Sequence, residues 1–248
     1  MDFAPHEEIQ KMAAAKLAAL LADEVKISPL VLDGKNREEK TAFAPRFIHF
    51  LRQHGAPYQT ISIDLSESGG KRIDMMRFLA DLAQGLPDEE RKRFFQAAEW
   101  LMRLATEEQE MLENYLRRKS DDALATAISG ADVESLLQTH LQTQRNIRII
   151  RTILEKYTAE HPLLVFIDGL DTCSADFVIK VLKTIDIVFK VSHLQFILLA
   201  DMGHLLESVA AFYGPSVNPV AWLDRMTGFR FKFGPPAIRD SDLLTEMS

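Results

Sequence analysis

A glycine, a lysine and a threonine stand at the spacing of a phosphate-binding loop. Gly34, Lys40 and Thr41 match these positions of the pattern G-x-x-x-x-G-K-[ST], between a short apolar run and a helical pattern. In such a loop, backbone N–H groups surround phosphate oxygens, the lysine reaches the terminal phosphates and the hydroxyl binds Mg²⁺. Glu39 stands where the second glycine is expected, so the match is incomplete.

Two carboxylates follow a second apolar run. Residues 163–167 are all apolar, the run ends at Asp168, and Asp171 comes three residues later. A continuous apolar run is typical of a strand covered on both faces of a parallel sheet, and ligands bind beyond the carboxyl ends of such strands. A carboxylate at a buried strand end needs a partner, and in P-loop proteins it usually binds Mg²⁺.

Strand and helix patterns alternate at both ends of the chain and predict an α/β fold with a parallel sheet. The predicted strands lie near residues 30–32, 58–65, 163–168, 194–200 and 229–233. The predicted helices lie over residues 6–26, 40–54, 174–191, 202–213, 220–227 and 238–247.

The middle of the chain has almost no strand pattern. Between residues 73 and 160 we expect four or five helices, the last over 132–159. We therefore predict an α/β core formed by residues 1–72 and 161–248, and an all-α insert, residues 73–160, between the second and third strands.

Several segments resemble KAP-type P-loop NTPases. Residues 163–173, LLVFIDGLDTC, resemble the Walker B segment of that family, in which four apolar residues precede D-D-L-D-R-C. Residues 196–201 resemble its fourth strand with a polar end, and residues 222–231 resemble its Y-L-(D/E)-K stretch before the fifth strand. The resemblance extends over residues 6–68 and 160–236. It implies a five-stranded P-loop NTPase-like sheet in the order 5-1-4-3-2.

The resemblance also implies a site for ATP and Mg²⁺ at the ends of the first and third strands. Gly34, Lys40 and Thr41 would bind the cofactor's phosphates, which makes them a degenerate Walker A segment. Asp168 and Thr41 would hold the metal.

Three further residues are candidate catalytic groups: Asp171, Asp201 and Arg225. In an active enzyme Asp171 or Asp201 would orient the attacking water, and Arg225 would contact the γ-phosphate or a neighbouring subunit. Structural roles stay open for all three: a loop or helix-cap carboxylate at Asp171, an N-cap at Asp201 and a surface salt bridge at Arg225. Without nucleotide, we expect Lys40 and Asp168 to pair with each other.

The sequence departs from the family pattern where phosphate binding and hydrolysis need it most. Glu38 and Glu39 bring two carboxylates to the loop, and like charges about 4 Å apart repel by roughly 1–4 kcal/mol. Gly169 replaces the acidic residue that often follows the Mg²⁺ aspartate, and Thr172 replaces a common arginine. ATP and Mg²⁺ are therefore expected only if the site is functional, and no cofactor is the alternative.

The composition is that of an ordinary soluble protein, with 47% hydrophobic and 26% charged residues and a net charge of -7. An acidic balance does not indicate a general nucleic-acid surface. A stripe of Arg145, Arg148 and Arg151 in the insert fits either phosphate or nucleic-acid binding or a solvated helix face. The single cysteine, the absence of a signal-peptide pattern and the short apolar runs predict a cytoplasmic protein without an integral membrane segment.

Two functions follow from the sequence. The first is a KAP-like protein with a degenerate nucleotide site and weak or no ATP hydrolysis, which acts through protein–protein contacts of the helical insert. The alternative is an active Mg²⁺-dependent ATPase of KAP type, in phage exclusion or defence in a bacterial or phage setting. A homo-oligomer stays open for both.

Overall fold

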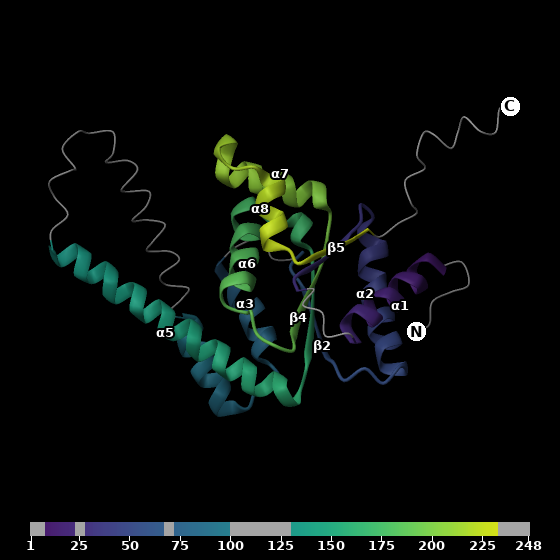
Figure 1. The fold of residues 1–248 in the computed structure, drawn as a ribbon, viewed down its shortest axis with the longest axis horizontal. Coiled ribbons are helices and arrows are strands. Elements are labelled where there is room, and N and C mark those ends of the chain that lie inside the picture. Colours follow the sequence, from purple (N-terminus) through teal and green to yellow (C-terminus); the bar gives the residue numbers. More distant parts are fainter. Residues whose placement is uncertain (1–7, 23–27, 67–71, 100–129, 233–248) are drawn as a thin grey trace. The chain divides into compact units, whose positions relative to one another are not determined.

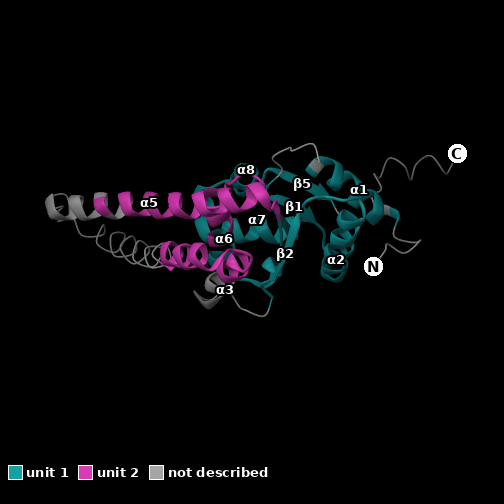
Figure 2. Ribbon diagram, turned by 90° about the horizontal axis from the view of Figure 1, so that it is seen from below, with its two compact units in different colours: residues 1–70, 164–179, 195–248 teal, residues 71–163, 180–194 magenta. Residues whose placement is uncertain are grey.

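The computed structural model describes residues 8–22, 28–66, 72–99 and 130–232. The chain divides into two compact units, coloured separately in Figure 2. The first comprises residues 1–70, 164–179 and 195–248, and the second comprises residues 71–163 and 180–194. The boundaries of the predicted insert, 73–160, stay a prediction; the second unit also takes in residues 180–194.

A five-stranded parallel sheet organises the fold (Figure 1). Its strands are β1 (Leu30–Asp33), β2 (Gln59–Asp64), β3 (Leu163–Asp168), β4 (Leu194–Ala200) and β5 (Phe229–Lys232). Their order is β2-β3-β4-β1-β5, which confirms the predicted order read from the opposite edge. Strand β1, between β4 and the edge strand β5, pairs in parallel with both, so that Asp33 lies level with Ala200 on one side and Lys232 on the other.

The strands that read as continuous apolar runs are the buried ones. All six residues of β3 are buried, as are six of the seven in β4, because helices cover both faces of a parallel sheet. β2 at one edge and β5 at the other are mostly exposed or half-buried. The difference confirms that continuous apolarity in this sequence marks interior strands.

Two helices pack on one face of the sheet: α1 (Glu8–Ala22) and α2 (Arg37–Gln53) (Figure 1). One buried cluster joins them to the strands; it contains Ala13, Ala14, Leu17, Leu21, Phe43, Ala44, Phe47, Leu51, Leu30, Leu32, Leu164, Phe166, Ile197 and Leu199. The residues from α1 and α2 recur three or four positions apart, which is the period of an apolar helix face. This packing fixes the direction in which α2 leaves the end of β1.

The remaining helices of the described chain are α3 (Arg72–Ala83), α5 (Gly130–Glu160), α6 (Ala175–Ile187), α7 (Met202–Tyr213) and α8 (Pro219–Met226), with short 3-10 turns at Leu170–Thr172 and Gly214–Ser216. Residues 88–99 are also helical. The predicted helices between residues 100 and 129 and over 238–247 lie outside the described residues.

The second unit is held together by helix–helix contacts. Phe78 of α3 packs against Phe189, with ring centroids 5.9 Å apart. Arg151 of α5 donates to the backbone oxygens of Ile187 and Val188, which are carbonyls at the end of α6. Guanidinium donors commonly satisfy such orphan carbonyls. Arg151 therefore belongs to the packing of the unit rather than to a solvated stripe. No helix in the described part of the chain is long and apolar enough to span a membrane.

Candidate functional site

The segment with the spacing of a phosphate-binding loop is mostly helical. β1 ends at Asp33 and α2 begins at Arg37, so only Gly34, Lys35 and Asn36 connect them. The expected start at residue 40 is therefore wrong by three residues. A local cap explains the difference, because the Asn36 side chain accepts a hydrogen bond from the backbone N–H of Glu39 at 3.4 Å and donates to the Glu39 carboxylate at 3.2 Å.

Lys40 lies in the first turns of α2 and is completely buried. Its Nζ is 2.7 Å from Oδ2 of Asp171, whose side chain is 21% exposed. A buried ammonium group needs such a partner, as the sequence indicated. The expected partner, Asp168, is wrong: the two oxygens of that carboxylate are bonded elsewhere, and the turn after β3 brings Asp171 to the lysine instead.

Asp168 ends β3 and is 8% exposed. Its Oδ2 accepts a hydrogen bond from the Thr41 hydroxyl at 2.5 Å, and its Oδ1 accepts one from the backbone N–H of Gly169 at 2.7 Å. The structure thus brings together Thr41 and Asp168, the two residues that the resemblance assigned to a metal. In the described structure, both oxygens of this carboxylate have protein donors.

The carboxylates also satisfy the start of α7, beyond β4. Asp171 accepts from the backbone N–H of Asp201 at 2.9 Å, and Asp33 accepts from that of Met202 at 3.0 Å. Asp201 itself accepts from Gly203 N–H at 2.7 Å, which makes it the N-cap of α7. In the structure Asp201 therefore has the N-cap role that the sequence left open for it.

Gly169 is required by the backbone at the end of β3. Its φ is +82°, in the left-handed region that favours glycine. A Cβ at this position would lie 2.4 Å from the backbone nitrogen of Ser66, in the loop that follows β2. That loop is anchored, because Leu65 N–H donates to the Asp168 carbonyl at 2.9 Å and Ser66 N–H donates to Asp64 at 2.8 Å. An acidic side chain at position 169 does not fit this arrangement.

Arg225 is not joined to this cluster. It is exposed in the last turn of α8, and none of the hydrogen bonds or ion pairs found among the described residues links it to Lys40 or the carboxylates. A surface salt bridge of Arg225, with Asp224 or a nearby glutamate, was the structural alternative; Asp224 pairs with Arg230 of β5 instead.

Sequence reasoning missed Asp33, Asn36 and Asp64. Each has a local signal: Asp33 directly follows the predicted strand 30–32, Asp64 lies next to the end of the predicted strand 58–65, and Asn36 stands three residues before Glu39, the spacing of a capping box. With them, the carboxyl edge of the sheet carries Asp33, Asp64, Asp168, Asp171 and Asp201, with Glu38 and Glu39 exposed on α2. Lys40 is the buried cation among them and Arg37 lies 3.8 Å from Asp64, so the carboxylates at this edge outnumber these two cations.

A family model, described as the KAP family P-loop domain, matches residues 9–225 of the chain. The chain belongs to the KAP family. The family match and the strand order agree with each other, and P-loop domains of this family generally bind a nucleotide and Mg²⁺. A search of curated proteins found no match.

Among solved structures, the chain is similar to the ORC2 protein of Aeropyrum pernix in ADPNP-ADP complexes. The sequences are 12% identical, the TM-score is 0.46, and the match covers 99% of this KAP-family chain and 51% of the ORC2 chain. The chain thus spans about half the length of that protein.

The residues present fit the two ligands of the family unequally. The Thr41 hydroxyl and the Asp168 carboxylate are oxygen donors of the kind that Mg²⁺ prefers, and they already lie together. The phosphate cradle does not fit. Its connection has only three residues, the Gly34 N–H donates to the Ala200 carbonyl at 3.3 Å, and the Asn36 side chain holds the Glu39 N–H. Two of the N–H groups that a phosphate-binding loop would offer, those of Gly34 and Glu39, therefore already have acceptors within the chain.

Proposed function

We propose that this KAP-family chain has a degenerate nucleotide site with weak or no ATP hydrolysis, and that it acts through protein–protein interaction. The observation that carries the proposal is the ion pair at 2.7 Å between the fully buried Lys40 and Asp171. The Asp171 carboxylate neutralises the charge of the lysine and occupies the place beside its ammonium group. ATP would have to displace Asp171 before it could use this lysine.

Two further features support the same proposal. Glu38 and Glu39 stand exposed in the first turn of α2, where like-charge repulsion of roughly 1–4 kcal/mol lowers affinity for a triphosphate by about one to three decades. Helix N-termini attract anions through their free N–H groups. At α7 these groups already donate to Asp33, Asp171 and Asp201. The chain's own carboxylates thus already satisfy the N–H groups at the start of α7.

Calorimetric titration of the purified protein with Mg²⁺-ATP tests the proposal. We expect no saturable heat at micromolar ATP. The matched variant is Glu38→Gln with Glu39→Gln, which removes the repulsion and leaves the short loop and the ion pair; we expect it to remain without tight binding. Micromolar affinity in the unmodified protein would contradict the proposal.

The alternative, an active Mg²⁺-dependent ATPase, has one specific observation in its favour: the 2.5 Å contact between the Thr41 hydroxyl and the Asp168 carboxylate, two oxygen donors suited to Mg²⁺. It requires Lys40 to leave Asp171 when nucleotide binds. It predicts phosphate release that disappears in both Lys40→Ala and Asp168→Ala. Phosphate release that survives both substitutions belongs to another site or to a contaminant.

A further inference from the structure

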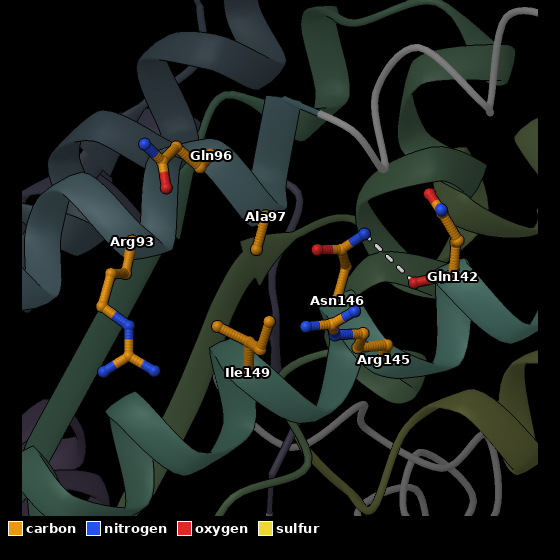
Figure 3. Close-up of a pocket in the computed structure, with 7 residues that line it drawn as sticks. All are labelled: Arg93, Gln96, Ala97, Gln142, Arg145, Asn146 and Ile149. Carbon is orange, nitrogen blue, oxygen red and sulfur yellow. Dashed lines mark hydrogen bonds between the residues drawn. The ribbon is translucent and has the colours of Figure 1, made fainter.

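A polar groove runs along the second unit between helix 88–99 and α5 (Figure 3). Its volume is about 310 Å³. Arg93 and Gln96 line it from the first helix, and Arg145 and Asn146 line it from α5. Gln142 adds a third carboxamide. We refer to this site as the Arg93–Arg145 groove.

The two helices are fixed against each other beside the groove. Lys156 of α5 lies 3.4 Å from Glu90 of the shorter helix, and apolar side chains on the inner sides of both helices, Phe94, Ile150 and Ile153, are buried. Ala97 and Ile149 form the apolar part of the lining, between the two arginines in Figure 3. The groove is therefore a feature of packed helices, whose backbone positions are set by a core.

The two arginines of the groove differ from Arg91 and Lys92, the two basic residues that precede Arg93. Arg91 donates to the Leu86 carbonyl and pairs with Asp88, and Lys92 pairs with Glu89. Arg93 and Arg145 are exposed and have neither an ion pair nor a hydrogen bond among the residues that the structure describes. Two guanidinium groups thus face one groove with their charges unneutralised by these residues.

We propose that the Arg93–Arg145 groove docks an acidic segment of a partner protein. Guanidinium groups present a planar fork of donors that matches a carboxylate, and three carboxamides beside them can bond the backbone of a bound chain. The small Ala97 and the apolar Ile149 leave room for the aliphatic part of a glutamate side chain. This inference rests on the proposed function, because it gives the protein–protein interaction a surface and a partner chemistry.

Charge around the groove favours a protein over a nucleic acid. Glu89, Glu90 and Glu99 lie on the same helix as Arg93, and Asp88 begins it. A nucleic-acid footprint needs basic residues along a whole face, so that several phosphates are neutralised together. Two groove-lining arginines, with several carboxylates on the helix of Arg93, suit short-range recognition of one or two carboxylates.

The test uses fluorescence anisotropy with the full chain and a defined probe: a fluorescein-labelled peptide of five Glu-Glu-Ala repeats. We expect saturable binding that weakens about fivefold or more in Arg93→Gln and in Arg145→Gln, since each loses a charge-assisted contact. The matched control is Arg148→Gln, which removes an exposed arginine of the same helix outside the groove. We expect it to change affinity less than about twofold, as screened surface charges do. These side chains are exposed, so circular dichroism should show that all variants fold.

Three results would overturn the inference: no saturable binding of the glutamate peptide, equal binding of a Gln-Gln-Ala peptide, or equal loss in the Arg148→Gln control. Tighter binding of a fifteen-residue thymidine oligonucleotide, lost in the same two variants, would assign the groove to nucleic acid instead. The calorimetric titration with Mg²⁺-ATP is independent of this assay. Failure of peptide binding therefore leaves the degenerate nucleotide site intact, and micromolar ATP binding leaves the groove intact.

Discussion

Removal of either partner of the Lys40–Asp171 ion pair should destabilise the protein, and by unequal amounts. In Asp171→Asn the lysine keeps its charge in a fully buried place without a counter-ion, and we expect a loss of about 3–5 kcal/mol. In Lys40→Met the remaining carboxylate is 21% exposed and still accepts from Asp201 N–H, so water and that donor offset part of the cost. We expect about 1–2 kcal/mol there.

Urea denaturation of the two single variants and the double variant measures this asymmetry. The double variant should cost less than the sum of the singles, because it leaves no unpaired charge. A loss of 3 kcal/mol corresponds to a fall in Tm of roughly 6–12 °C for a chain of this size. The matched control is Lys92→Met, which breaks an exposed pair with Glu89 and should change stability by less than about 0.5 kcal/mol. If Asp171→Asn is as stable as the control, the pair is not formed in solution and the reasoning about the occupied lysine fails.

Three further predictions concern stability and use the same denaturation assay. Gly169→Ala should lower the free energy of unfolding by about 3 kcal/mol or more, because the new Cβ would meet backbone atoms. Gly55→Ala, at φ +68° with nothing within 4 Å, should lower it only by the conformational strain of about 1 kcal/mol. Equal losses in the two variants would rule out the clash at position 169. Thr41→Val should lower the free energy of unfolding by roughly 1–3 kcal/mol, because it removes the hydrogen bond to the Asp168 carboxylate. Thr41→Ser keeps the hydroxyl and should retain most of that stability. A Thr41→Ser variant as unstable as Thr41→Val would contradict the hydrogen bond. Arg151→Met should lower the free energy of unfolding by about 1–2 kcal/mol, because it leaves the carbonyls of Ile187 and Val188 without their donor. Arg148→Met, which changes an exposed residue of the same helix, should be near neutral. Similar effects of the two substitutions would place Arg151 on the solvated stripe.

Sequence patterns were sufficient for the parallel sheet, and the resemblance to the KAP family supplied the order of its strands. The runs ending at Asp33, Asp168 and Ala200 were continuous because both faces of an interior parallel strand are covered, and the structure places those strands inside. The start of α2 was misjudged although Asn36 and Glu39 have the spacing of a cap, since the pattern of a phosphate-binding loop suggested a later start. The hydrogen bonds between Asn36 and Glu39 therefore fix the start of α2 at Arg37.

The sequence by itself determined which chemical groups stand at the carboxyl edge of the sheet: one lysine that must be paired, one hydroxyl beside it, and carboxylates at the strand ends. Only the tertiary structure decided which of these groups meet. Lys40 and Asp171 are separated by 131 positions, and the partner depends on a turn at Gly169 whose backbone conformation and close approach to Ser66 are set by the neighbouring strand. Local sequence shows which side chains stand at the strand ends, but packing sets the distances between segments that are far apart in the chain. A match to a phosphate-binding pattern therefore could not reveal that the lysine of the pattern was already neutralised.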